Sequence, residues 1–91
     1  MVNILIVDDH LIVREGIRLI LETQDEYCVI GEAENGQEAL SLMETITPDL
    51  ILLDLNMPIL DGLNFLKKLK CAGSEIPVII LTTYNENHLL I

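Results

Sequence analysis

Four short apolar runs alternate along the chain with segments in which apolar residues recur at helical spacing. The runs cover 4–7, 27–30, 50–53 and 78–81, and three of them are nearly uninterrupted. Uninterrupted runs of this length are typical of strands that are covered on both faces. The helical stripes between them are Leu11, Ile12, Ile17, Ile20 and Leu21; Ala39, Leu40, Met43 and Ile46; and Leu63, Leu66 and Leu69. This order predicts an α/β fold, a doubly wound parallel sheet with right-handed crossovers.

Composition narrows the class of protein. The 91 residues suit one domain, and 15 acidic against 5 basic residues give a formal charge of −10. That charge argues against direct binding of nucleic acid and is compatible with a divalent cation or a basic partner. Cys28 and Cys71 form no metal-binding pattern, which indicates reduced thiols in a cytoplasmic protein. The run Val2–Val7 is too short to span a bilayer, so no membrane association is expected.

Polar residues follow three of the predicted strands at the point where each strand ends. Asp8 and Asp9 follow the first run, Asp54 and Asn56 the third, and Thr82 and Thr83 the fourth. The carboxyl ends of parallel strands share one edge of a sheet, where ligands of such folds bind. Carboxylates brought together there repel unless a cation offsets them, and Mg²⁺ prefers oxygen ligands.

These residues can be interpreted either as groups that react with phosphate or as ordinary structural residues. An Asp can attack a phosphoryl group to form an acyl phosphate, and a Thr hydroxyl can donate to a phosphoryl oxygen. Taken singly, Asp9 could only cap the following helix, Asp54 could be an ordinary loop carboxylate, and Thr82 a strand-end hydroxyl. The functional reading depends on their combination at three strand ends.

The motifs together resemble the receiver domain of bacterial two-component response regulators. They are Ile6-Val7-Asp8-Asp9, Leu52-Leu53-Asp54-Leu55-Asn56-Met57-Pro58, Asp61-Gly62 and Val78-Ile79-Ile80-Leu81-Thr82. The stretch Asp8-Asp9-His10 with Val13-Arg14-Glu15-Gly16, Gly31-Glu32-Ala33 and Asn35-Gly36 is most similar to the subgroup that precedes a LuxR-type helix-turn-helix. The resemblance implies a flavodoxin-like fold with strand order 2-1-3-4.

The resemblance also implies roles for individual residues. Asp54 would accept the phosphoryl group from a sensor histidine kinase, and the chain would act as a switch for a transcription-regulating output domain. Asp8 and Asp9, with Asp54 and the backbone carbonyl of Asn56, would hold Mg²⁺. Thr82 would be the switch hydroxyl. The remaining candidate switch or loop residues are Thr83 and Tyr84, and an exposed loop aromatic is the default for Tyr84. His10 is expected to be structural rather than a phosphoryl donor.

The chain departs from the family pattern in three places. Leu11 stands where the subgroup commonly has Pro, and Ile59-Leu60 stands where the family usually has Gly or another small residue. The chain also stops at Ile91, before the expected fifth strand, its Lys and the last helix. We therefore expect an incomplete receiver domain over 1–91, with DNA bound only through an absent output domain. An exposed edge at 78–81 predicts a homodimer or domain-swapped assembly, and the missing Lys predicts weak or absent phosphorylation of this fragment.

Two other classes of function remain to be weighed. A Mg²⁺-dependent phosphatase with an aspartyl nucleophile would need an acid–base Asp two residues after Asp54, where Asn56 stands instead. A nucleotide-binding domain would need a glycine-rich loop after the first strand, where Asp8-Asp9-His10 stands. The expected role is therefore a phosphoacceptor, not an enzyme, which at most assists its own phosphorylation and dephosphorylation.

Overall fold

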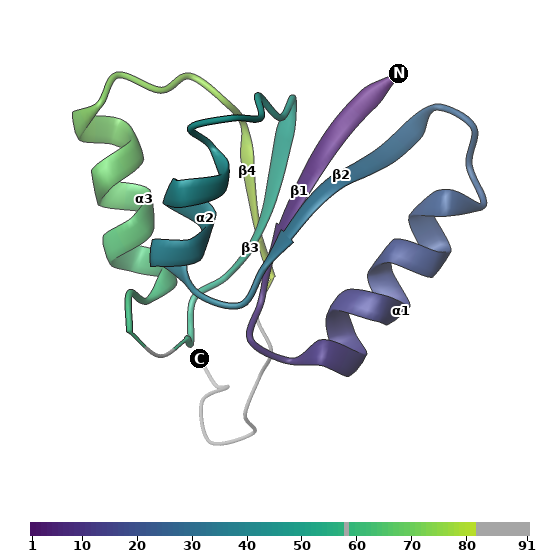
Figure 1. Cartoon of the computed structure of the whole chain (residues 1–91), viewed down its shortest axis with the longest axis horizontal. Helices are drawn as coiled ribbons and strands as arrows, with labels where there is room; N and C mark the ends of the chain where they lie inside the picture. Colours follow the sequence, from purple (N-terminus) through teal and green to yellow (C-terminus); the bar gives the residue numbers. More distant parts are fainter. Residues whose placement is uncertain (58, 82–91) are drawn as a thin grey trace.

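A computed structural model of the chain describes residues 1–57 and 59–81. In this part of the chain four parallel strands form one sheet with helices on both faces (Figure 1). The elements in chain order are β1 (Val2–Val7), α1 (Leu11–Glu22), β2 (Tyr27–Ala33), α2 (Gly36–Leu42), β3 (Leu50–Asp54), α3 (Gly62–Cys71) and β4 (Val78–Leu81).

The strand order is β2-β1-β3-β4, and every pairing is parallel. The predicted doubly wound sheet with order 2-1-3-4 is therefore confirmed. β1 lies between β2 and β3, and its residues Ile4 to Val7 pair in register with Leu50 to Leu53. This register brings the carboxyl ends of β1 and β3 side by side, which is where the candidate site residues begin.

The sheet has two unequal faces. α2 and α3 cover one face, where the cluster contains Leu5, Val7, Ile51 and Leu53 from the strands (Figure 1). Of the described elements, α1 alone covers the other face, where Ile4, Ile6 and Leu52 form a smaller cluster. Alternating side chains of β1 and β3 thus point to opposite faces, as expected for strands buried on both sides.

The expected stripe on the first helix is only partly correct. Ile17 and Leu21 pack on the sheet, but Leu11, Ile12 and Ile20 are exposed. The helical period places Ile17 and Leu21 one turn apart on the face that meets the sheet. Leu11 and Ile20 lie at the sides of that face. Ile12, nine residues before Leu21, lies on the opposite side of the helix, so it does not belong to the stripe.

The third helix buries a residue that its apolar stripe did not include. Phe65 is fully buried and is the only Phe in the sequence, whereas Leu63 is half exposed. Leu69 is buried as expected, and Leu66 packs against the same cluster. Phe65 lies four residues before Leu69, so both share one helical face against the sheet.

Two glycines bring helix ends close to the loops around the site. A Cβ at Gly62 would overlap the backbone carbonyl of Asp54 and lie 2.6 Å from Cα of Leu55. At Gly36, the amide donates to the carbonyl of Leu60 (2.9 Å), and a Cβ would lie 2.7 Å from that oxygen. The Asp61-Gly62 and Asn35-Gly36 motifs therefore permit the helix starts to approach the loop that follows β3.

Candidate functional site

The candidate site lies at the carboxyl ends of β1 and β3. Val7 pairs with Leu53, so Asp8 and Asp54 emerge next to each other although they are half a chain apart in the sequence. Both side chains are fully buried, and Asp9 beside them is partly exposed. The prediction that these three carboxylates meet at one edge is confirmed, because one ligand atom from each lies within 4.8 Å of the others.

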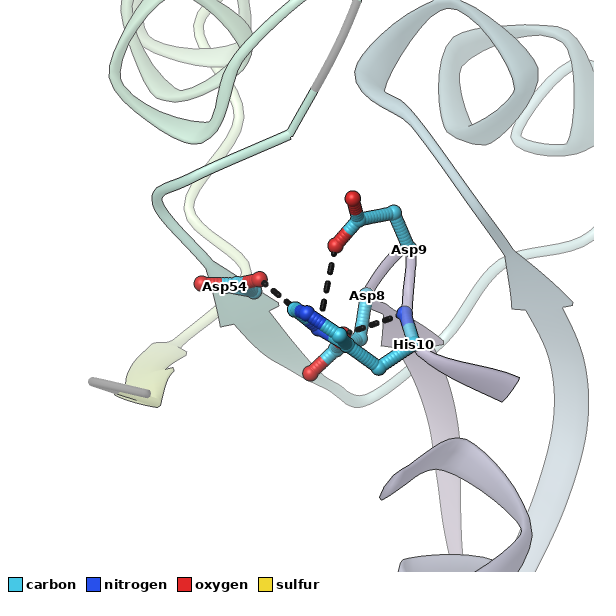
Figure 2. Close-up of side chains that lie close together, drawn as sticks. All are labelled: Asp8, Asp9, His10 and Asp54. Carbon is cyan, nitrogen blue, oxygen red and sulfur yellow. Dashed lines mark hydrogen bonds and ion pairs between the residues drawn. The ribbon is translucent and has the colours of Figure 1, made fainter. Parts of the chain in front are cut away.

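His10 completes this group, which we call the acidic cluster (Asp8, Asp9, His10 and Asp54; Figure 2). Its Nδ1 lies 2.9 Å from Asp8 Oδ1, 3.1 Å from Asp9 Oδ1 and 3.9 Å from Asp54 Oδ2. One ring nitrogen thus faces carboxylates from the ends of two strands. The His10 side chain is 53% exposed, so the ring forms the outer side of the cluster.

The carboxylates raise the pKa of His10 above its usual range. The hydrogen bond with Asp8 has the largest effect, followed by the negative charge of Asp9. Partial burial opposes them, and the charges of Asp8 and Asp54 add to the increase. The neighbouring carboxylates therefore stabilise the imidazolium form of His10 relative to the neutral ring.

Contacts from α1 and β2 hold the backbone at Asp8. The Asp8 carboxylate accepts a hydrogen bond from the amide of His10 (2.8 Å), and a guanidinium N–H of Arg14 donates to the Asp8 carbonyl (2.7 Å). Glu32 on β2 forms ion pairs with Arg14 (3.3 Å) and Arg18 (3.1 Å). The Arg14 side chain is 13% exposed, so this anchor lies mostly inside the molecule.

The other half of the site is the loop after β3. Oδ1 of Asp54 accepts a hydrogen bond from the amide of Asn56 (3.1 Å), which turns the chain directly after the strand. Asp61 then caps α3 by accepting from the amide of Asn64 (2.8 Å). Asn56 and Asp61 therefore position the loop from both ends, while Gly62 allows α3 to begin against the Asp54 backbone.

The structure decides between two readings of Asp9. The N-cap residue of α1 is His10, and among the described residues no side chain makes a capping hydrogen bond there. The reading of Asp9 as a simple helix cap is therefore wrong. Its carboxylate faces His10 instead and belongs to the acidic cluster.

The acidic cluster meets the requirements of a Mg²⁺ site. It offers three carboxylates in a small volume, and Oδ2 of buried Asp8 has no hydrogen-bond partner among the residues that the structure describes. A buried carboxylate oxygen without a partner is costly, and a bound cation would satisfy it. The residues present therefore fit a hard divalent cation.

Comparison with known proteins gives the family. The family model described as the response regulator receiver domain matches residues 4–91. The chain belongs to the response regulator receiver family. The receiver is 55% identical over 89 residues to the transcriptional regulatory protein YdfI of Bacillus subtilis, which covers 98% of this chain and 41% of that protein.

Two further matches are also response regulators. It is 41% identical over 87 residues to the nitrate/nitrite response regulator NarL of Escherichia coli, covering 93% of this chain and 40% of NarL. It matches the crystal structure of a LuxR-family response regulator from an Aurantimonas species with a TM-score of 0.85 at 33% identity, covering 93% and 61% of the two chains. The receiver thus spans about two fifths of the length of these curated relatives.

Several expected site residues lie outside the described residues. These are Thr82, Thr83 and Tyr84, so their expected roles stay predictions. Asn56 is exposed beside Asp54, and its amide contact is established, whereas the metal-binding role expected for its carbonyl also stays a prediction.

Sequence reasoning missed two members of the site region. His10 was expected to be structural, yet its ring faces three carboxylates, and Arg14 had no expected role. The signal for both was present, because His10 directly follows Asp8-Asp9 and Arg14 lies one helical turn after His10. Cys28 and Cys71 are free thiols, of which Cys28 is partly buried and Cys71 is exposed.

The loop after β3 contains Ile59, one of the residues that depart from the family pattern. Ile59 adopts φ of 68°, the left-handed region that favours Gly, and its side chain is exposed. A Gly would fit this conformation without strain, and Ile59 does not. In the described part of the chain, no helix has the length and apolar character needed to cross a membrane.

Proposed function

We propose that this receiver is a phosphorylation-dependent switch of a two-component system, with Asp54 as the phosphoacceptor. A sensor histidine kinase donates the phosphoryl group, and the output is regulation of transcription through a DNA-binding domain elsewhere in the protein. The observation that carries the proposal is the position of Asp54, which ends β3 within 4.8 Å of Asp8 and Asp9. We place the receiver in the cytoplasm, with its kinase partner.

The chemistry follows from the residues present. A carboxylate oxygen of Asp54 attacks phosphorus, forming a P–O bond as the P–N bond to the donor histidine breaks. Asp8, Asp9, Asp54 and the Asn56 carbonyl would hold Mg²⁺, which when bound offsets the negative charge of the phosphoryl oxygens. The amide of Asn56 holds Asp54 in place. Thr82 would donate its hydroxyl to a phosphoryl oxygen.

A role in turnover of other substrates is disfavoured. An aspartyl-nucleophile phosphatase needs an acid–base group two residues after the nucleophile, and the Asn56 side chain cannot exchange a proton at neutral pH. The receiver therefore assists only its own phosphorylation and dephosphorylation.

The test is labelling with a small phosphodonor. Acetyl phosphate and Mg²⁺ are added to the wild-type chain, to Asp54→Asn and to the control Asp25→Asn. The control changes an exposed carboxylate just before β2 begins, at the opposite end of the sheet from the acidic cluster. Mass spectrometry of peptides should find a phosphoryl group on Asp54 in the wild type and control. Equal labelling of Asp54→Asn would overturn the assignment.

We also propose that this chain associates with itself. In the described part of the chain β4 lies at the edge of the sheet, with Ile79 51% and Ile80 39% exposed. Unpaired backbone groups beside exposed apolar side chains are a template for another strand. Light scattering during size-exclusion chromatography should show a dimer or a swapped assembly that weakens in Ile79→Glu. A single monomeric species at high concentration would contradict this.

A further inference from the structure

The position of His10 raises a question that the family site does not answer. A receiver site that uses only carboxylate, carbonyl and water oxygens has no need of an imidazole. Here Nδ1 of His10 points into the space shared by Asp8, Asp9 and Asp54 (Figure 2). This nitrogen, and not the outer edge of the ring, makes the short contacts with the two carboxylates of Asp8 and Asp9.

The spacing of these atoms matches that of ligands around one cation. With metal–ligand bonds of about 2.1 Å, neighbouring octahedral ligands lie about 3 Å apart and opposite ones about 4.2 Å apart. The distances from His10 Nδ1 are 2.9 Å to Asp8, 3.1 Å to Asp9 and 3.9 Å to Asp54. The first two correspond to neighbouring positions, and the third is close to an opposite one.

A second observation points to a ligand at the same place. The Asp8 carboxylate is fully buried, and its Oδ2 has no hydrogen-bond partner in the described residues. His10 Nδ1 is in contact with the other oxygen, Oδ1. The His10 contact therefore leaves part of the buried charge of Asp8 unsatisfied, as expected for a group prepared for a cation.

We propose that His10 is a fourth protein ligand of this site, through Nδ1, for divalent transition-metal ions that accept imidazole, such as Ni²⁺ and Co²⁺. This inference rests on the proposed function, since it uses the same three carboxylates. Imidazole suits these ions, whereas Mg²⁺ keeps to oxygen ligands and water. Mg²⁺ would therefore bind without His10, and the half-exposed ring would turn outward.

The same geometry has a competing explanation with the opposite consequence. His10 could act as an internal cation that occupies the cluster and is displaced by any metal. Removing the ring would then strengthen binding of Mg²⁺ and Ni²⁺ alike. Preference for Ni²⁺ over Mg²⁺ does not distinguish the two explanations, because Ni²⁺ binds more tightly at most sites. Only the effect of removing His10 does.

The experiment measures both metals in matched variants of the untagged chain. Calorimetric titrations with Ni²⁺ and with Mg²⁺ compare wild type, His10→Asn, and His88→Asn, which removes the other histidine of the sequence. We expect His10→Asn to weaken Ni²⁺ binding at least about tenfold and to change Mg²⁺ binding by no more than about twofold. His88→Asn should change neither. Circular dichroism checks that the variants fold.

A spectroscopic measurement tests the bond itself. X-ray absorption spectroscopy of bound Ni²⁺ should show one imidazole ligand in the wild type and none in His10→Asn. Unchanged Ni²⁺ affinity in His10→Asn, or tighter binding of both metals, would overturn the inference and leave the proposed function intact. If Mg²⁺ failed to bind the wild type, the shared carboxylate site and both proposals would fall together.

Discussion

The face of the sheet under α2 and α3 is closed by apolar packing, whereas the face under α1 depends on charged contacts. The first face buries Phe65, Leu69 and Ala39 against the strands, while within the described part of the chain no α1 residue is fully buried. Arg14 and Arg18 instead join α1 to Glu32 on β2. The apolar face therefore supplies most of the stability. The charged contacts of α1 instead hold the site in place, because His10 is the N-cap residue of that helix.

The largest test of this comparison is to remove one apolar side chain from each face. Phe65→Ala should destabilise the chain by about 3–5 kcal/mol, since it leaves a cavity in the closed face. Ile17→Ala on the α1 side should cost less than about 2 kcal/mol, because that residue is only partly buried. Urea unfolding followed by circular dichroism measures both. Equal losses would show that the two faces contribute alike.

A second test uses two glycines, one on each side. Gly62→Ala should destabilise by about 2–3 kcal/mol and weaken Mg²⁺ binding, because the new methyl group displaces the backbone at Asp54. The matched control is Gly16→Ala in α1, where nothing lies within 4 Å of the added Cβ. That change should stabilise by about 0.5–1 kcal/mol through helix propensity. A loss at Gly16 comparable to that at Gly62 would refute the close-approach argument.

The charged contacts between α1 and the sheet are tested by replacing Arg14. Arg14→Ala should cost about 1–2 kcal/mol, because it removes a hydrogen bond from a charged donor to the Asp8 carbonyl. Arg18→Ala, at a more exposed ion pair, should cost less than about 1 kcal/mol. Hydrogen exchange should be faster in α1 of the first variant. If both variants exchange alike, Arg14 has no special part in holding the helix.

The smallest effect is expected at Ile59, in the loop that leads to α3. Ile59→Gly should stabilise by about 0.5–1 kcal/mol, since relief of a left-handed residue outweighs the added flexibility of the unfolded chain. Ile59→Ala keeps a Cβ in the same conformation and should gain less. Unfolding curves with a common slope would give the difference, and a loss of stability in the Gly variant would argue against strain.

The comparison also explains which features were predictable from the sequence. The strands were predictable from the sequence. In a chain where apolar runs alternate with helical segments, an uninterrupted run such as Ile4 to Val7 is a strand of a parallel sheet. The meeting of Asp8, Asp9 and Asp54 followed from parallel strands ending at one edge. The exposure of Leu11 and Ile20 was not predictable, since periodicity identifies an apolar stripe but not how much of it a neighbour covers. Ile12 was assigned to the stripe wrongly, because the helical period places it opposite Leu21.

The direction of individual side chains was the other feature that the sequence did not predict. Phe65 was missed because a stripe of leucines already satisfied the helical pattern, although Phe65 fills the larger space. His10 was read as structural because no spacing rule says which way a ring turns after a strand. The left-handed backbone of Ile59 was not predicted either. The sequence showed only that Ile59 stands where a small residue was expected, and this does not reveal the backbone conformation of the loop.

The pairing of β1 with β3 has a consequence for the timing of folding. The residues that it joins are separated by half the chain, so the acidic cluster cannot exist until β3 has been made and has docked beside β1. At roughly 5–20 residues per second, ribosomes need a few seconds to synthesise that interval. Long-range pairing of this kind is also slow in itself. A newly made chain therefore passes through a period in which Asp8 and Asp9 are present but the acidic cluster has not yet formed.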